Sequence, residues 1–309
     1  MTPLTFAPFG ETLDVPNVVV DGSANRSTVL TLSHWPGTDC PTELQADLSA
    51  QMAFRYLDEG ARRHGEARVV TDNHFDEDGV VAMFALVDPA TALAQRELLI
   101  DVARAGDFGR FRDRRAARMS MVIAAWAETL DTVSAYRHTL PLLGTLATAL
   151  EDHRELWVDD DEHLTRSERA IVDGVVRLED DPTLDLAVVT TPVDHVPHPM
   201  AVNNRTTCLR VATVQGRQLQ LEYRYETWIR LRSRAPMPRV ELGGLAQRLS
   251  ELEPDGVEWA ADPVDALTPR LAPTGDGNSD LDASVFLAEV RTWLAAAKST
   301  WSPYDDPVA

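Results

Sequence analysis

The sequence predicts an α/β fold, with a mostly parallel sheet flanked by helices and a smaller α+β domain in the C-terminal part. In the first half, short apolar runs alternate with segments of helical character, which is typical of a parallel sheet covered by helices. After the Pro-rich segment 191–200, strand-like runs and two helical segments follow. At about 150 residues per domain, a chain of 309 residues is long enough for two domains.

The elements of the first half follow the order β-β-α-β-α. We expect strands at 17–21, 28–34 and 67–72, because each is a short apolar run next to turn residues. Residues 42–63 are expected to form a helix, since Thr42 and Gln45 resemble a capping box and apolar residues recur at near-helical spacing. The continuous apolar run 80–87 predicts a buried helix.

The rest of the chain supplies the remaining elements and the domain boundary. A first domain is expected over 1–190, with a helical insertion at about 111–180 and a buried strand at 185–190. The three prolines within 191–200 predict a linker. The second domain, 201–309, is expected to hold strands at 207–213 and 218–231 and helices at 242–252 and 281–297.

Charge composition limits the possible functions. With 29 Lys and Arg against 49 Asp and Glu, the net charge is −20, which repels long duplex nucleic acid and anionic membranes. The arginine-rich run 110–118 is expected to be a solvated helix face. Lys298 is the only lysine and no Gly-rich loop precedes it, so Walker A and pyridoxal chemistry are excluded. The expected partner is a small phosphorylated substrate or a short oligonucleotide.

Three further features predict a cytoplasmic location. The N-terminus lacks a secretory signal, and the chain has no apolar run of 18 residues. Cys40 and Cys208 form neither a CxxC motif nor a disulfide framework. The sequence does not address the oligomeric state.

Metal-ligating side chains follow the predicted strands. In open α/β sheets, ligands bind at the carboxyl ends of the strands, where loops from distant parts of the chain converge. Carboxylates and imidazoles suit Mn²⁺ or Mg²⁺, and two such ions about 3.5–4 Å apart can activate water and clamp a phosphate. We therefore predict a site for one or two ions with these ligands: Asp21, His34, His74, Asp76, Asp78 and Asp107.

The strongest single motif is His74-x-Asp76-x-Asp78-Gly79. An EF-hand loop would need Asp at its first position and Glu at its twelfth, where this chain has His74 and Ala85. The alternative that stays open is an acidic turn beside a surface histidine.

This motif resembles the first motif of the DHH phosphoesterases, H-x-D-x-D-G. The resemblance implies that His74, Asp76 and Asp78 are catalytic metal ligands. Asp21 resembles the family's second motif. The segment 33–36 (SHWP) resembles a degraded D-H-H motif, and Asp107 resembles the last metal aspartate. The order of these segments implies a permuted arrangement, and the missing D-H-H residues imply a reduced ligand set. The whole chain also resembles an uncharacterised bacterial family of unknown function.

The C-terminal part resembles the companion substrate-binding domain of the DHH phosphoesterases at 228–234 and 240–246. Arg230, Arg232 and Arg234 would alternate along a strand and present one face to a phosphate; the alternative is a solvated face paired with Glu222 or Glu226. His195, in the Pro-rich segment, is either a substrate contact or part of the linker.

These observations favour a metal-dependent phosphoesterase whose cleft lies between two domains. The alternative is a non-catalytic protein that binds a nucleotide or another small molecule and keeps a degenerate metal site. A serine or cysteine hydrolase is disfavoured, because the chain has no G-x-S-x-G elbow.

Overall fold

The structure is a computed structural model that describes residues 2–59, 65 and 67–305. The chain divides into two compact units. Unit 1 holds the chain up to Glu162 together with Arg230–Arg234, and unit 2 holds His163–Ile229 and the chain from Ala235 onward. The sequence predicts a boundary at about residue 190, whereas the change of unit falls between Glu162 and His163.

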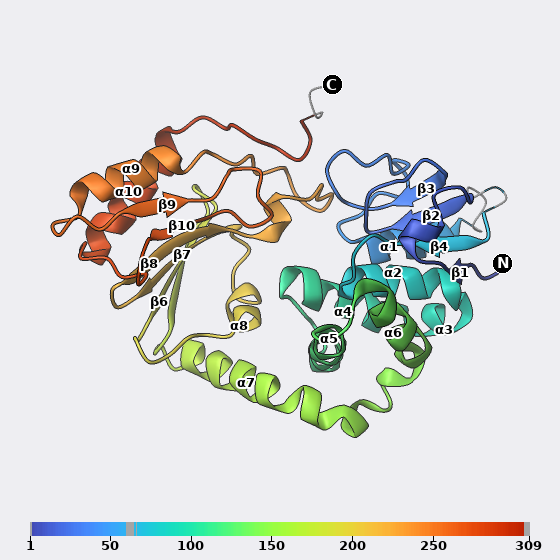
Figure 1. Cartoon of the computed structure of the whole chain (residues 1–309). Coiled ribbons are helices and arrows are strands. Elements are labelled where there is room, and N and C mark those ends of the chain that lie inside the picture. The colour runs from blue at the N-terminus through green and yellow to red at the C-terminus, as the bar shows by residue number, and fades with distance from the viewer. Residues whose placement is uncertain (1, 60–64, 66, 306–309) are drawn as a thin grey trace. The chain divides into compact units, whose positions relative to one another are not determined.

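Unit 1 contains a four-stranded sheet in which every strand pair is parallel. Its order is β1-β4-β2-β3, with β1 at Thr5–Phe6, β2 at Asn17–Val20, β3 at Thr28–Leu32 and β4 at Val69–Thr71. β2 and β3 pair through Val18–Leu30 to Val20–Leu32, and all four residues of β2 are buried. The carboxyl ends of β2, β3 and β4 therefore point to the same edge of the sheet (Figure 1).

Helix α2 is the central helix of unit 1. It spans Glu77–Val87 and is buried along Asp78–Leu86, as the continuous apolar run predicts, and it packs against α1 and α4. The other helices are η1 (Phe9–Glu11), α1 (Ser49–Asp58), α3 (Pro89–Ala94), α4 (Arg96–Phe108), α5 (Arg114–Ala127), α6 (Thr132–Leu146) and η2 (Leu150–Leu156). Helix α7 (Val158–Val172) runs across the boundary between the units.

The first long helix begins later than the sequence predicts. The expected helix covers 42–63, but α1 begins at Ser49, and 60–64 lies outside the described residues. The proposed capping box at Thr42 and Gln45 is wrong, because the Gln45 side-chain amide donates to the Cys40 carbonyl at 2.8 Å within a loop. The N-terminus of α1 is instead capped by a carboxylate from α2.

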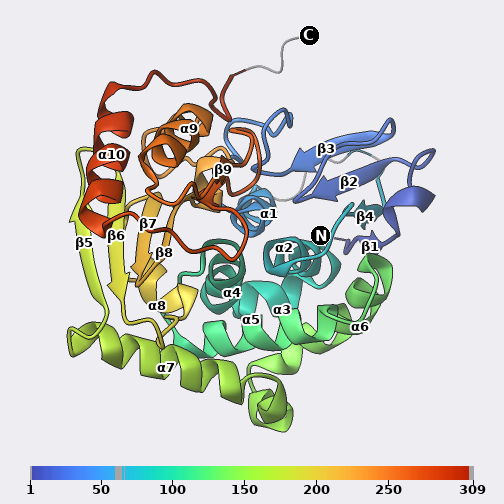
Figure 2. The same ribbon diagram turned by 60° about the vertical axis from the view of Figure 1, so that its left-hand side comes forward.

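Unit 2 contains a six-stranded mixed sheet. Its order is β5-β6-β7-β8-β10-β9, formed by Arg177–Asp181, Leu186–Thr191, Arg210–Gln215, Gln218–Tyr223, Arg270–Pro273 and Trp259–Ala261. Only β6 and β7 are parallel neighbours; β5 to β8 lie side by side in Figure 2. Helices α9 (Gly243–Leu252) and α10 (Ala283–Ala296) match the predicted helices and share a core with this sheet. The short helices are α8 (Pro199–Asn203) and η3 (Tyr225–Thr227).

The Pro-rich segment 191–200 is not a linker between the units. It lies within unit 2, where it forms part of the connection between β6 and its parallel neighbour β7. The buried strand expected at 185–190 is present as β6, but the sheet of unit 2 contains it. Among the described residues, no helix combines the length and the apolar character that a bilayer span requires.

Candidate metal centre

The ends of three parallel strands carry the predicted ligands of unit 1. Asp21 follows β2, His34 follows β3 by one residue, and His74 follows β4 through Asp72 and Asn73. The N-terminus of α2 adds two carboxylates, Asp76 as its N-cap and Asp78 in its first turn. We call the following residues the Asp–His cluster: Asp21, His34, Asp72, His74, Asp76, Asp78 and Asp107.

Asp21 lies between the two histidines. Its Oδ1 lies 3.3 Å from His34 Nε2, and its Oδ2 lies 3.3 Å from His74 Nε2. Asp21 therefore belongs to two groups of potential metal ligands, one with His34 and Asp78 and one with Asp72 and His74; within each group, the ligand atoms lie within 4.8 Å of one another. The backbone of Asp21 has φ +47°, a left-handed conformation that Asp tolerates better than most residues.

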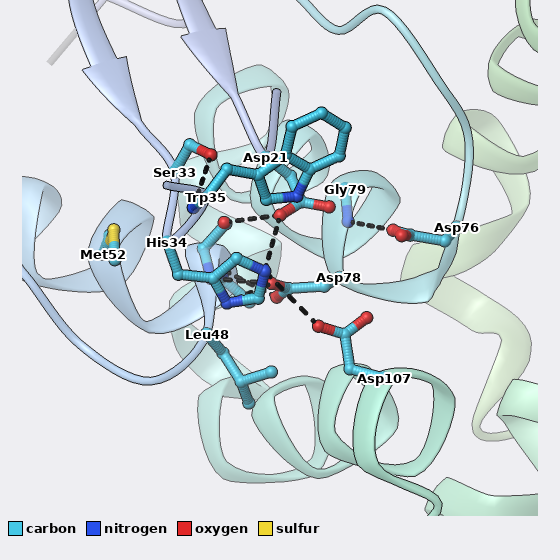
Figure 3. A network of polar contacts seen from close by, with 12 residues as sticks. Asp21, Ser33, His34, Trp35, Leu48, Met52, Asp76, Asp78, Gly79 and Asp107 are labelled. Atoms are coloured by element: carbon cyan, nitrogen blue, oxygen red, sulfur yellow. Dashed lines mark hydrogen bonds and ion pairs between the residues drawn. The ribbon is translucent and has the colours of Figure 1, made fainter. Parts of the chain in front are cut away.

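Asp107 reaches the cluster from a helix. The sequence places it after a strand, but it lies in the last turn of α4, which ends at the left-handed Gly109 (φ 58°). The strand assignment is therefore wrong, although Asp107 Oδ2 lies 3.6 Å from His34 Nε2. Figure 3 shows the His34 ring directed toward Asp21, Asp78 and Asp107.

The geometry of His34 fixes its tautomer. Its Nδ1 lies 2.6 Å from the Asp47 carbonyl oxygen, which can only accept, so Nδ1 carries the proton. Burial lowers the pKa of His34 to about 4 against the opposing effect of this carbonyl, and the ring is therefore neutral at pH 7. The lone pair of Nε2 then faces oxygens of Asp21 and Asp107, an arrangement that a cation or a carboxyl proton would stabilise.

Among the described residues, no arginine neutralises the carboxylates around His34, and the only other base beside them is His74, 3.3 Å from Asp21 Oδ2. The side chains of Asp21, Asp78 and Asp107 are at most 4% exposed, and Asp21 Oδ2 and Asp107 Oδ2 accept no hydrogen bond. Burial, and then nearby carboxylates, raise the pKa of Asp21 and Asp107 well above the usual value and that of Asp78 to about 7. Buried charges are stable only when paired or bound to metal, so this donor set fits a divalent cation.

His74 and Asp76 form the solvent-accessible side of the cluster. Their side chains are 29% and 31% exposed, and His74 Nε2 lies 2.9 Å from Asp76 Oδ2. Burial lowers the pKa of His74, but Asp21, Asp72 and Asp76 outweigh it and raise the pKa. For Asp76 the effects have the opposite sign. Burial raises its pKa, but the contacts with His74 outweigh burial, so the pKa of Asp76 is lowered. These two side chains are therefore the accessible part of the cluster.

Asp78 has a structural role that the motif does not reveal. Its two oxygens accept the backbone N–H groups of Ser49 at 2.6 Å and Ala50 at 2.8 Å. These are the first two residues of α1, and their N–H groups have no partner within that helix. Asp78 thus caps α1 from a distant part of the chain, and its negative charge suits the positive end of the helix dipole.

Three residues of the site were not predicted from the sequence. Asp72 lies beside His74 with its Oδ1 3.2 Å from Nδ1, Tyr136 donates to Asp72 Oδ2 at 2.6 Å, and Ser49 Oγ donates to Asp21 Oδ1 at 2.6 Å. Asp72 directly follows a strand, so the rule that found Asp21 applies to it too. Ser49 and Tyr136 carry no local signal, because long-range packing brings them to the cluster.

The arginines at 230–234 do not alternate along a strand, because β8 ends at Tyr223 and η3 follows. They form an irregular segment grouped with unit 1. The Arg230 N–H donates to the His34 carbonyl at 2.9 Å, and the N–H groups of Arg232 and Ser233 donate to Asp47 Oδ1 at 2.6 and 2.9 Å. Arg230 and Arg232 also line a small pocket with Ser33 and His34, whereas Arg234 does not line it.

His195 lies in unit 2, in the connection between β6 and β7. Its carbonyl accepts from Thr191 Oγ1 at 2.6 Å, while its Nε2 is buried without a hydrogen bond. A substrate contact at His195 remains a prediction.

Comparisons with known proteins place the chain in a family. The sequence profile of a family of unknown function, DUF6687, matches residues 2–305, and the chain belongs to that family. No curated protein sequence matches it. A solved structure, the pGpG-specific phosphodiesterase PggH from Vibrio cholerae, is similar with a TM-score of 0.44 and 9% sequence identity, over 94% of this chain and 88% of that one.

Proposed function

We propose that this member of a family of unknown function is a metal-dependent phosphoesterase that hydrolyses a small phosphorylated or nucleotide substrate. The observation that carries the proposal is the contact of Asp21, Asp107 and His34 Nε2 inside a buried region, where two carboxylate oxygens accept no hydrogen bond. One or two ions of Mn²⁺ or Mg²⁺ would be held by Asp21, His34, His74, Asp76, Asp78 and Asp107. Such an ion polarises a phosphoryl oxygen and makes water more acidic.

The residues of the chain prepare the site in two ways. Asp47 holds His34 in the tautomer whose lone pair faces the carboxylates, so a ligand atom is oriented before any ion binds. His74 and Asp76, the more exposed members, would lie nearest the substrate. In the reaction, a water oxygen bonds to phosphorus, the P–O bond to the leaving group breaks, and the leaving oxygen gains a proton.

The arginines of 230–234 are proposed to bind the phosphate. Arg230 and Arg232 lie beside His34, where they line a hollow of about 10 Å³ that holds no more than one water molecule. A phosphate would therefore bind outside this hollow, where guanidinium groups can offer its oxygens two parallel hydrogen bonds. The Arg232 residue is exposed, so its side chain is accessible. The net charge of −20 favours a short, low-charge substrate over a long polyanion.

Hydrolysis assays test the proposal. Protein freed of metal with EDTA should hydrolyse a generic phosphodiester, a phosphomonoester or a 5′-phosphorylated dinucleotide only after Mn²⁺ or Mg²⁺ is restored. His74→Ala and Asp76→Ala should each lower kcat at least about 100-fold, because each removes a proposed metal ligand. His138→Ala is the matched control, since His138 is an exposed histidine of α6.

The outcomes separate the two functions. Activity without a divalent cation, or unchanged activity in both variants, would contradict the proposal. A substrate that raises the melting temperature in the presence of Mn²⁺ but is not turned over would support the alternative, a binding protein with a degenerate metal site.

A further inference from the structure

Asp72 and Tyr136 form a buried pair behind His74. The Tyr136 hydroxyl, from α6, donates to Asp72 Oδ2 at 2.6 Å, and the other oxygen of Asp72 lies 3.2 Å from His74 Nδ1. Asp72 is 2% exposed and Tyr136 is 0% exposed. Neither side chain is open to solvent, and the cluster residue whose ring the pair contacts is His74.

The two ring nitrogens of His74 face different partners. Nδ1 faces Asp72, whereas Nε2 faces Asp76 at 2.9 Å and Asp21 at 3.3 Å. When Nδ1–H donates to a carboxylate, a neutral imidazole has its lone pair on Nε2. Carboxylates that accept from the outer nitrogen of a metal-bound histidine fix its orientation and increase its basicity.

We propose that Tyr136 and Asp72 are positioning residues that present His74 Nε2 to a divalent cation. The inference rests on the proposed function, because it requires a cation in the Asp–His cluster. It assigns to helix α6 a part in metal binding, although no residue of α6 belongs to that cluster.

The contacts of Asp72 place it behind the histidine. Although its ligand atom lies within 4.8 Å of those of Asp21 and His74, Oδ1 also accepts from the Asn73 N–H at 2.6 Å, and Oδ2 accepts from Tyr136. A Cβ at Gly79 would lie 2.6 Å from Asp72 Oδ2 and 2.7 Å from the Tyr136 hydroxyl. The backbone of α2 therefore packs directly on the pair and limits its movement.

Titration of Mn²⁺, followed by the electron paramagnetic resonance signal of the free ion, tests the role. Tyr136→Phe removes one hydroxyl and should weaken Mn²⁺ binding about tenfold, and Asp72→Asn should weaken it about 10- to 100-fold. Tyr223→Phe is the matched control, because it removes a buried hydroxyl that contacts the Val240 carbonyl at 3.2 Å within unit 2. It should leave the affinity within twofold of wild type.

The position of the proton on His74 gives a second readout. In the Zn²⁺-loaded protein, ¹⁵N NMR of labelled histidine should show His74 protonated on Nδ1, with the resonance assigned by its loss in His74→Gln. A proton on Nε2 would overturn the inference. It would also be overturned if the Tyr136→Phe and Asp72→Asn proteins fold and bind Mn²⁺ with wild-type affinity. If Asp72→Asn does not fold, Tyr136→Phe decides alone. Failure of the wild type to bind Mn²⁺ would instead overturn the proposed function.

Discussion

Glu77 is a half-buried acid at the first position of α2 and lies beside the Asp–His cluster. Its carboxylate accepts from Ser120 Oγ at 2.9 Å and packs against α4 at Gly106, where a Cβ would lie 2.5 Å from the Cβ of Glu77. The glycine thus allows α2 and α4 to approach closely. Burial, and then the charge of Asp76, raise the pKa of Glu77 to about 7.

The raised pKa of Glu77 predicts a pH-dependent stability. Between the ordinary value of 4.5 and about 7, the folded state binds more protons than the unfolded state, so the contribution of Glu77 to stability falls as the pH rises through this range. The stability of Glu77→Gln relative to wild type should therefore rise between pH 4.5 and pH 8. The gain is at most about 3.5 kcal/mol, because one pKa unit corresponds to about 1.4 kcal/mol. Urea unfolding in EDTA at both pH values measures the difference.

A control for the loss of one carboxylate is Glu97→Gln, because Glu97 lies exposed in the first turn of α4. If wild type and Glu77→Gln differ by the same free energy at pH 4.5 and pH 8, Glu77 does not titrate as its burial implies.

At the scale of elements, the segment 230–234 holds the loop that carries His34. Its backbone donates to the His34 carbonyl and, through Arg232 and Ser233, to Asp47 Oδ1. The Asp47 carbonyl in turn accepts from His34 Nδ1. Asp47 therefore connects the two: its side chain binds the segment 230–234, and its backbone carbonyl binds the candidate metal ligand His34.

Removing the Asp47 side chain should loosen this connection. Asp47→Ala keeps the carbonyl that orients His34 but loses the acceptor for two backbone N–H groups, and it should lower the free energy of unfolding by about 1–2 kcal/mol. We expect the affinity for Mn²⁺ to fall several-fold as well, which isothermal titration calorimetry measures. Asp39→Ala, an exposed aspartate of the same loop, is the control; equal affinities of the two variants would contradict this role.

The elements of unit 1 were predictable where their signals are local. β2, β3 and β4 are apolar runs next to turn residues, and Asp21, His34 and His74 lie close together after their ends; that these residues bind a metal stays a prediction. The start of α1 was not predictable, because its cap, Asp78, is 29 residues away from Ser49 in sequence. Arginine at every second position from Arg230 to Arg234 is typical of a strand, but hydrogen bonds to the His34 loop determine the conformation of this segment.

At the scale of the whole molecule, the α/β class was predictable from the sequence, but the division into units was not. The sequence of 163–190 does not indicate which sheet its strand joins, and the pairing of β6 with β7 places this segment in unit 2. Part of the net charge of −20 is concentrated at the candidate metal centre. The Asp–His cluster gathers five aspartates around two histidines, so bound cations would make the charge of the loaded protein less negative.

Anomalous X-ray diffraction from a crystal soaked in Mn²⁺ tests the central claim most directly, because the signal locates the ion independently of the protein atoms. The account predicts an anomalous peak in unit 1 within coordinating distance of Asp21 and at least one of His34 and His74, and its loss in a His74→Ala, His34→Ala double variant that still crystallises. The account would be contradicted if a crystal soaked at millimolar Mn²⁺ shows no anomalous peak at the Asp–His cluster, or shows one only at other carboxylates.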